Sequence, residues 1–135
     1  MISILIVEDN ASITRMIREL VGDLTDCVDQ CNDGLQAVRL YRLRQPDWVL
    51  MDVEAAGFDG IEATRRIRQD FPAANILMVG NYDDSRMREA AMQAGARAYV
   101  HKENLLEVRR LLIRAQFSHR SRQFHLHEPS ERKAQ

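Results

Sequence analysis

Four charged residues follow apolar runs of the chain, and together they could bind a cation. Glu8 and Asp9 come directly after the apolar run 2–7, Asp52 ends a second such run, and Lys102 lies just after a third. Two carboxylates 4 Å apart repel each other by about 4 kcal/mol at an effective dielectric constant of about 20. A cation usually relieves such a cluster. Because the donors are oxygens, without Cys or His, the pattern favours Mg²⁺ or Mn²⁺.

Lys102 would bring a positive charge to the same cluster. Of the 19 Arg and Lys residues, only Lys102 and Lys133 are lysines. A compact ammonium group suits a point contact to a phosphoryl oxygen. Taken singly, each acid is more simply a solvated loop residue and Lys102 a surface lysine. The shared position of these residues after apolar runs favours a site.

An alternation of strands and helices must position these residues. The β-branched run 2–7 predicts a strand buried on both faces. Further strands are predicted at 26–31, 48–52, 76–79 and 98–100. Apolar residues at helical spacing predict helices at 13–21, from 35 to before Pro46, at 61–71, from 84 or 85 through 94, and at about 105–117.

Polar residues at the starts of three helices are candidate caps. Ser12 is expected to cap the first helix, and Asp84 or Ser85 the fourth, because short polar side chains accept hydrogen bonds from the first free N–H groups. Asn104 with Glu107 has the spacing of a capping box for the last helix.

Five strand–helix alternations predict an α/β fold with a parallel, doubly wound sheet covered on both faces. Right-handed crossovers leave few topologies. The strand order 2-1-3-4-5, a flavodoxin-like (βα)5 arrangement, is the natural one at this length. Ligands of such sheets bind beyond the carboxyl ends of the strands, where strands 1 and 3 meet. Glu8, Asp9 and Asp52 are therefore expected to lie together.

The bulk composition limits the class of protein. A chain of 135 residues with 45% hydrophobic and 29% charged residues suits one domain, predicted over 1–117, with a basic and flexible tail or linker at 118–135. The net charge of -1 indicates neither nucleic acid nor a membrane surface. Cys27 and Cys31 lack the companions of a zinc site, so free buried thiols are expected. With neither a secretory leader nor a membrane span apparent, we expect a cytoplasmic protein.

Four segments together resemble the receiver domain of two-component response regulators, over about residues 1–117. They are ILIVEDN at 4–10, DWVLMDV at 47–53, FDGIEATRRIR at 58–68 and AGARAYVHK at 94–102. Any one of them alone would be weak, but at these spacings they are specific. The resemblance implies a chemotaxis-regulator-like fold and a signalling domain that catalyses only its own phosphorylation and dephosphorylation.

The resemblance also implies a role for each site residue. Asp52 would accept the phosphoryl group from a sensor histidine kinase, a phosphotransfer protein or a small acyl phosphate. It would share the metal with Asp9, which binds directly, with Glu8, which acts through water, and with the backbone carbonyl of Glu54. Lys102 would contact the phosphoryl group.

Residue 80 departs from the family pattern. The family usually has Thr or Ser there, whereas this chain has Gly80. In the family, that hydroxyl residue moves toward the phosphate and an aromatic residue on strand 5, here Tyr99, follows it inward. We expect that Asp52 can still be phosphorylated but that the conformational coupling is weak or altered. Gly80 would also leave room for Tyr99 to turn inward without phosphorylation.

The resemblance leaves the output open. The leading hypothesis is a phosphorylation-switched domain that binds partners, or a second copy, through the face of the fourth helix, fifth strand and fifth helix. One alternative is a phosphorylation-independent pseudo-receiver, which Gly80 favours and the intact charged set disfavours. Another is the truncated receiver of a DNA-binding regulator, which would contact nucleic acid only through a removed output domain. An enzyme is not expected, since no G-x-G-x-x-G loop follows the first strand.

Overall fold

The computed structural model describes residues 1–54, 59–81 and 85–117. The chain divides into two units, Met1–Leu105 and Leu106–Gln135. The first unit holds the whole sheet and four helices. In the second, residues 106–117 are helical. The predicted domain limits of 1–117 and 118–135 stay a prediction, and the tail lies outside the described residues.

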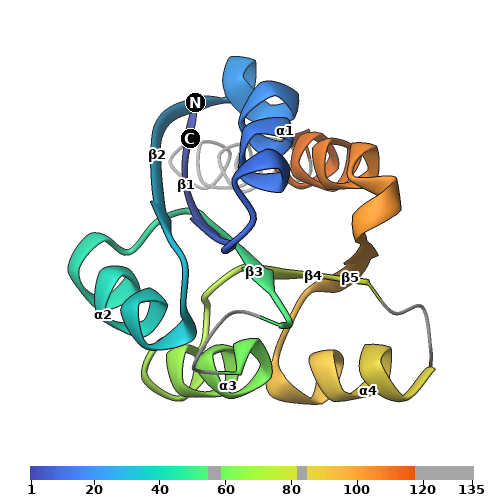
Figure 1. Cartoon of the computed structure of the whole chain (residues 1–135). Coiled ribbons are helices and arrows are strands. Elements are labelled where there is room, and N and C mark those ends of the chain that lie inside the picture. Colours follow the sequence, from blue (N-terminus) through green and yellow to red (C-terminus); the bar gives the residue numbers. More distant parts are fainter. Residues whose placement is uncertain (55–58, 82–84, 118–135) are drawn as a thin grey trace, which may run out of the picture. The chain divides into compact units, whose positions relative to one another are not determined.

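The first unit is built on five parallel strands in the order β2-β1-β3-β4-β5, shown in Figure 1. The predicted strand order is therefore confirmed, and the bounds differ from the prediction by one residue at β2, β4 and β5. The strands are β1 (Ile2–Val7), β2 (Thr25–Cys31), β3 (Trp48–Asp52), β4 (Ile76–Gly80) and β5 (Ala98–His101).

Helices cover both faces of this sheet, as predicted. α1 lies on one face, whereas α2, α3 and α4 lie side by side on the other (Figure 1). Their bounds are α1 (Ala11–Val21), α2 (Gly34–Arg44), α3 (Gly60–Asp70) and α4 (Ser85–Ala94). Among the described residues, no helix has the length and apolar character needed to cross a membrane.

The central strands form the core because helices shield them from both sides. Every residue of β3 and β4 is buried, which explains why their sequences are continuous apolar runs instead of alternating ones. Full burial of a side chain such as Leu50 contributes about 1.5–3 kcal/mol. β2 is an edge strand with a mostly exposed face, so Cys27 is exposed and the prediction of a buried thiol there is wrong.

The helix caps depart from the prediction. Asn10, not Ser12, caps α1: its side-chain oxygen accepts hydrogen bonds from the N–H groups of Ser12 (2.9 Å) and Ile13 (3.1 Å). Asn caps helices as well as Ser does. Because α1 begins at Ala11, Asn10 lies at the cap position and Ser12 lies within the first turn. Ser85 is the first residue of α4 and therefore not its cap. The other candidate, Asp84, lies outside the described residues.

The segment before the last helix also differs from the prediction. A 3₁₀ turn, Lys102–Asn104, follows β5 directly, and the helix starts at residue 106. His101 caps this turn, since its Nδ1 accepts the N–H of Glu103 at 3.0 Å. The turn determines where the Lys102 side chain leaves the backbone.

Gly60 lets α3 start against the end of β3. A Cβ atom on Gly60 would overlap the carbonyl oxygen of Asp52 and lie 3.1 Å from both the Asp52 carbonyl carbon and the Val53 Cα. These are backbone atoms, which cannot swing aside as a flexible side chain can. The close approach therefore ties the backbone of Asp52 to the start of α3.

We predict that Gly60→Ala lowers the free energy of unfolding by about 1–3 kcal/mol, the usual cost of forcing extra atoms into a packed site. Gly22→Ala is the matched control, because a Cβ on Gly22 meets no atom within 4 Å. Its effect should stay within about 0.5 kcal/mol. Urea unfolding followed by circular dichroism measures both, and equal midpoints for the two variants would contradict the packing argument.

Candidate functional site

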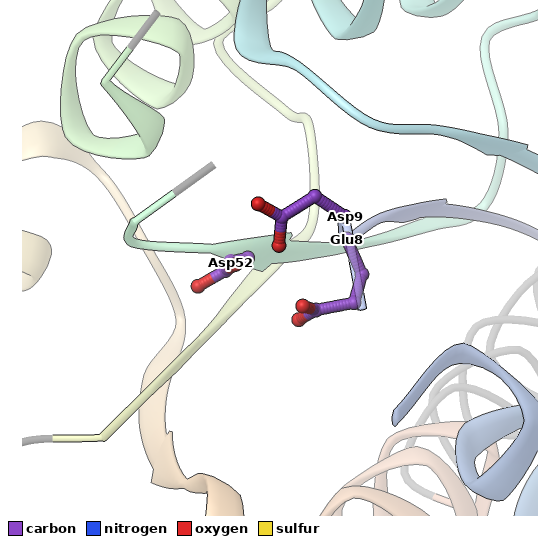
Figure 2. A group of neighbouring side chains, drawn as sticks. All are labelled: Glu8, Asp9 and Asp52. Atoms are coloured by element: carbon purple, nitrogen blue, oxygen red, sulfur yellow. The ribbon is translucent and has the colours of Figure 1, made fainter. Parts of the chain in front are cut away.

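The carboxylates of Glu8, Asp9 and Asp52 converge at the carboxyl edge of the sheet. β1 and β3 are neighbours, and the pairing of Val7 with Met51 brings the residues that follow them side by side. One carboxylate oxygen from each acid lies within 4.8 Å of the others. Figure 2 shows the three carboxylates pointing to the same side of the strand ends. The structure thus brings together the acids that the sequence pointed to.

Lys102 reaches the same place from the turn after β5. Its Nζ lies 3.4 Å from Glu8 Oε2 and 3.4 Å from Asp52 Oδ2. The side chains of Lys102, Glu8 and Asp52 are 12%, 2% and 1% exposed, so both ion pairs are screened little by solvent. One ammonium group therefore serves two buried carboxylates, while Asp9 is exposed at the mouth of the site.

Backbone N–H groups hold two of these carboxylates. Asp52 Oδ1 accepts the N–H of Glu54 at 3.0 Å, and Glu8 Oε1 accepts the N–H of Asn10 at 3.1 Å. The predicted site did not include Asn10, although its position directly after the two acids is a usable signal. Asp52 Oδ2 is buried and receives no hydrogen bond from the described residues. The ammonium of Lys102 lies 3.4 Å from this oxygen.

The electrostatics of the site are those of a cluster short of positive charge. Burial, followed by the charge of Asp52, raises the pKa of Glu8 from 4.5 to about 7, and Lys102 offsets this only in part. Burial acts to lower the pKa of Lys102, but the charges of Asp52 and Glu8 outweigh it and raise that pKa. The protein's own groups therefore leave Glu8 only partly ionised at neutral pH. A hard cation with oxygen preference fits this donor set.

The remaining residues with predicted roles border this cluster. Gly80 ends β4, next to β3, and Tyr99 is buried in β5. The side chain of Glu54 is exposed, and its carboxylate accepts a hydrogen bond from the side-chain amide of Asn81 at 3.4 Å. No sequence pattern predicted this bridge between the ends of β3 and β4. The role of the Glu54 carbonyl as a metal ligand stays a prediction.

A polar cavity of about 610 Å³ adjoins Glu8 and Asp9. It lies between α1 and the end of β2, and its lining includes Arg15, Gln30 and Asn32. The acidic cluster is therefore open toward the α1 side of the unit.

Known proteins resemble this chain in sequence and fold. The family described as response regulator receiver domain matches residues 4–114. The chemotaxis protein CheY of Halobacterium salinarum is 31% identical over 99 residues, which cover 73% of this chain and 82% of that protein. The response regulator GacA of Pseudomonas aeruginosa is 34% identical over 122 residues, which cover 87% of this chain but 56% of the relative. The chain thus spans little more than half the length of this longer regulator.

A solved structure agrees with these sequence matches. The crystal structure of a two-component response regulator of the LuxR family from Aurantimonas sp. SI85-9A1 superposes with a TM-score of 0.73 at 32% identity. The match covers 84% of this chain and 86% of that one. The matched residues include both strands that carry the acids, and the chain belongs to the family of response regulator receiver domains of two-component signalling.

Proposed function

We propose that this receiver accepts a phosphoryl group on Asp52 in a Mg²⁺-dependent reaction and so changes its binding to partner proteins. The observation that carries the proposal is the state of the Asp52 carboxylate. Its Oδ1 is held by the Glu54 N–H, while its Oδ2 is buried, accepts no hydrogen bond from the described residues and lies 3.4 Å from Lys102 Nζ. A carboxylate oriented in this way, with one oxygen left for reaction, can act as a nucleophile.

The donor set supports a role for Mg²⁺, with Mn²⁺ as an alternative of the same chemistry. Asp9 and Asp52 would hold the ion through carboxylate oxygens, Glu8 through water, and Glu54 through its backbone carbonyl. When bound, the ion would supply the positive charge that the buried acids lack and would neutralise charge on the phosphoryl oxygens. The pKa of Glu8, raised to about 7, is the sign of that deficit.

The residues of the chain would act by position and charge. Asp52 Oδ2 attacks the phosphorus, a P–O bond forms, and the bond from phosphorus to the donor breaks with its electron pair going to the leaving group. Lys102 Nζ, already beside Oδ2, would contact a phosphoryl oxygen. Phosphoryl transfer depends mostly on such positioning and charge stabilisation. Family membership supports a sensor histidine kinase or a phosphotransfer protein as the donor.

A second candidate function is a pseudo-receiver that binds partners without phosphorylation. Gly80 favours it, because residue 80 offers no hydroxyl to a phosphoryl group. The paired Lys102, Glu8 and Asp52 favour the first function, since buried charges cost free energy and contribute little net stability. Either version could sit in a longer regulator, as the partial match to GacA suggests, or act through a second copy of the chain.

We predict that the full chain gains the mass of one phosphoryl group when incubated with Mg²⁺ and acetyl phosphate. Asp52→Asn should show no gain, because an amide is not a nucleophile here, and removal of Mg²⁺ with EDTA should abolish the gain in the wild type. Asp26→Asn, an exposed acid on β2, is the matched control and should react normally. Equal gains in Asp52→Asn would put the acceptor elsewhere, and no gain in the wild type would favour the pseudo-receiver.

We also predict a pH-dependent loss of stability in metal-free protein. Folded Glu8 keeps its proton up to pH about 7, whereas the unfolded chain releases it near 4.5, so the folded state holds more protons between these values. Stability from Glu8 is thus full below pH 4.5 and falls as pH rises to 7. The loss is at most about 3.5 kcal/mol, at about 1.4 kcal/mol for each of the 2.5 pKa units between 4.5 and 7.

The measurement compares urea unfolding of the wild type and Glu8→Gln from pH 4.5 to 7.5. Acids outside the cluster are common to both proteins, so the difference between the two curves isolates Glu8 together with the groups coupled to it. Millimolar Mg²⁺ should flatten the difference, because the cation favours ionised Glu8. Parallel curves without Mg²⁺ would show that Glu8 is not the titrating group.

A further inference from the structure

Tyr99 lies inside the unit beside Gly80. The two residues belong to adjacent strands, with Met78 of β4 paired to Tyr99 and Gly80 to His101. Tyr99 is only 6% exposed, and its ring extends along the sheet to the position where a side chain on residue 80 would begin.

The Tyr99 ring and a side chain at position 80 exclude each other. A Cβ on Gly80 would overlap the Tyr99 hydroxyl oxygen and lie 3.0 Å from Cζ and 3.3 Å from Cε2. The backbone does not require glycine at this position, because the only described glycine with a positive φ is Gly95. Gly80 therefore matters because its lack of a side chain leaves space for the Tyr99 ring, and not because of its backbone freedom.

Contacts from α4 hold Tyr99 without help from the acidic cluster. The Arg88 guanidinium lies over the Tyr99 ring, 5.4 Å from its centroid, and donates to the Tyr99 carbonyl oxygen at 3.4 Å. The positive charge of a guanidinium is attracted electrostatically to the face of an aromatic ring. Neither of these two contacts involves Asp52 or Lys102, so neither depends directly on the charge of Asp52.

We propose that Gly80 keeps Tyr99 inward in both the unphosphorylated and the phosphorylated protein. The surface of α4 and β5 around Tyr99, here the α4–β5 face, then keeps one form throughout. Phosphorylation would change partner binding through the charge around Asp52, while this face stays as it is. The part of the inference that concerns phosphorylated protein rests on the proposed function, whereas the control of Tyr99 by Gly80 does not.

Fluorine NMR of the full chain labelled with 3-fluorotyrosine tests the inference. The chain has three tyrosines, and the signal that Tyr99→Phe removes identifies residue 99. A soluble gadolinium chelate broadens exposed signals, and buried Tyr41 serves as the protected reference. Spectra are recorded with Mg²⁺, before and after acetyl phosphate, and the phosphorylated fraction is measured by mass on the same sample.

We expect the Tyr99 signal of the wild type to be as protected as that of Tyr41, before and after phosphorylation. In Gly80→Ala, one added carbon should drive the ring outward and raise the broadening several-fold in untreated protein. Gly80→Thr should do the same, and its broadening should fall on phosphorylation, because a hydroxyl at position 80 restores a contact to the phosphoryl group. Gly22→Ala is the control and should match the wild type.

Two results would overturn the inference. The first is a wild-type Tyr99 that is several-fold more exposed before phosphorylation than after it. The second is a folded Gly80→Ala protein in which Tyr99 stays as protected as in the wild type. If the wild type gains no phosphoryl group, the proposed function fails, yet the untreated wild type and Gly80→Ala still decide what Gly80 does. If the variants do not fold, the wild-type spectra alone still decide whether Tyr99 moves.

Discussion

The pairing of one ammonium group with two buried carboxylates is the interaction on which the site depends. Lys102 lies 3.4 Å from both Glu8 and Asp52, and all three side chains are nearly shielded from water. A buried pair of this kind adds little net stability, because desolvation of the charges offsets their attraction. Here two negative charges face one positive charge, so the cluster is left with a deficit that a proton, a metal ion or both can fill. The arrangement therefore fits a reactive or ligand-binding site better than a stabilising one.

The scaffold keeps this costly cluster in place by anchoring its backbone in the sheet. The acids follow strands whose side chains pack on both faces, and strand pairing determines the spacing of Glu8 and Asp52. The close contact of Gly60 with the Asp52 backbone fixes where Asp52 lies relative to α3. The capped turn after β5 fixes the backbone of Lys102. Because each support is a backbone contact, the side-chain ends stay available for a ligand or a transferred group.

The packing of Tyr99 against Gly80 uncouples the acidic cluster from the α4–β5 face. In the family pattern, a hydroxyl residue at this position would lie between the phosphoryl group and the aromatic ring. In this chain the ring fills that space and is held by Arg88 of α4. The acidic cluster keeps its charged residues while the connection to the α4–β5 face is replaced by a packed contact. A receiver built in this way can react at one end and present a constant surface at the other.

The sequence by itself determined the strand order and the meeting of Glu8, Asp9 and Asp52, because continuous apolar runs and the rules of parallel sheets are local and general. It left undecided which residue caps α1, how far Glu8 is deprotonated and where the Tyr99 ring lies. Only the tertiary structure decided these points. The pKa of Glu8 depends on burial and on the distances to Asp52 and Lys102, and the place of Tyr99 depends on a neighbour in the next strand that has no side chain. No local sequence pattern predicts the distance between residues that lie far apart along the chain.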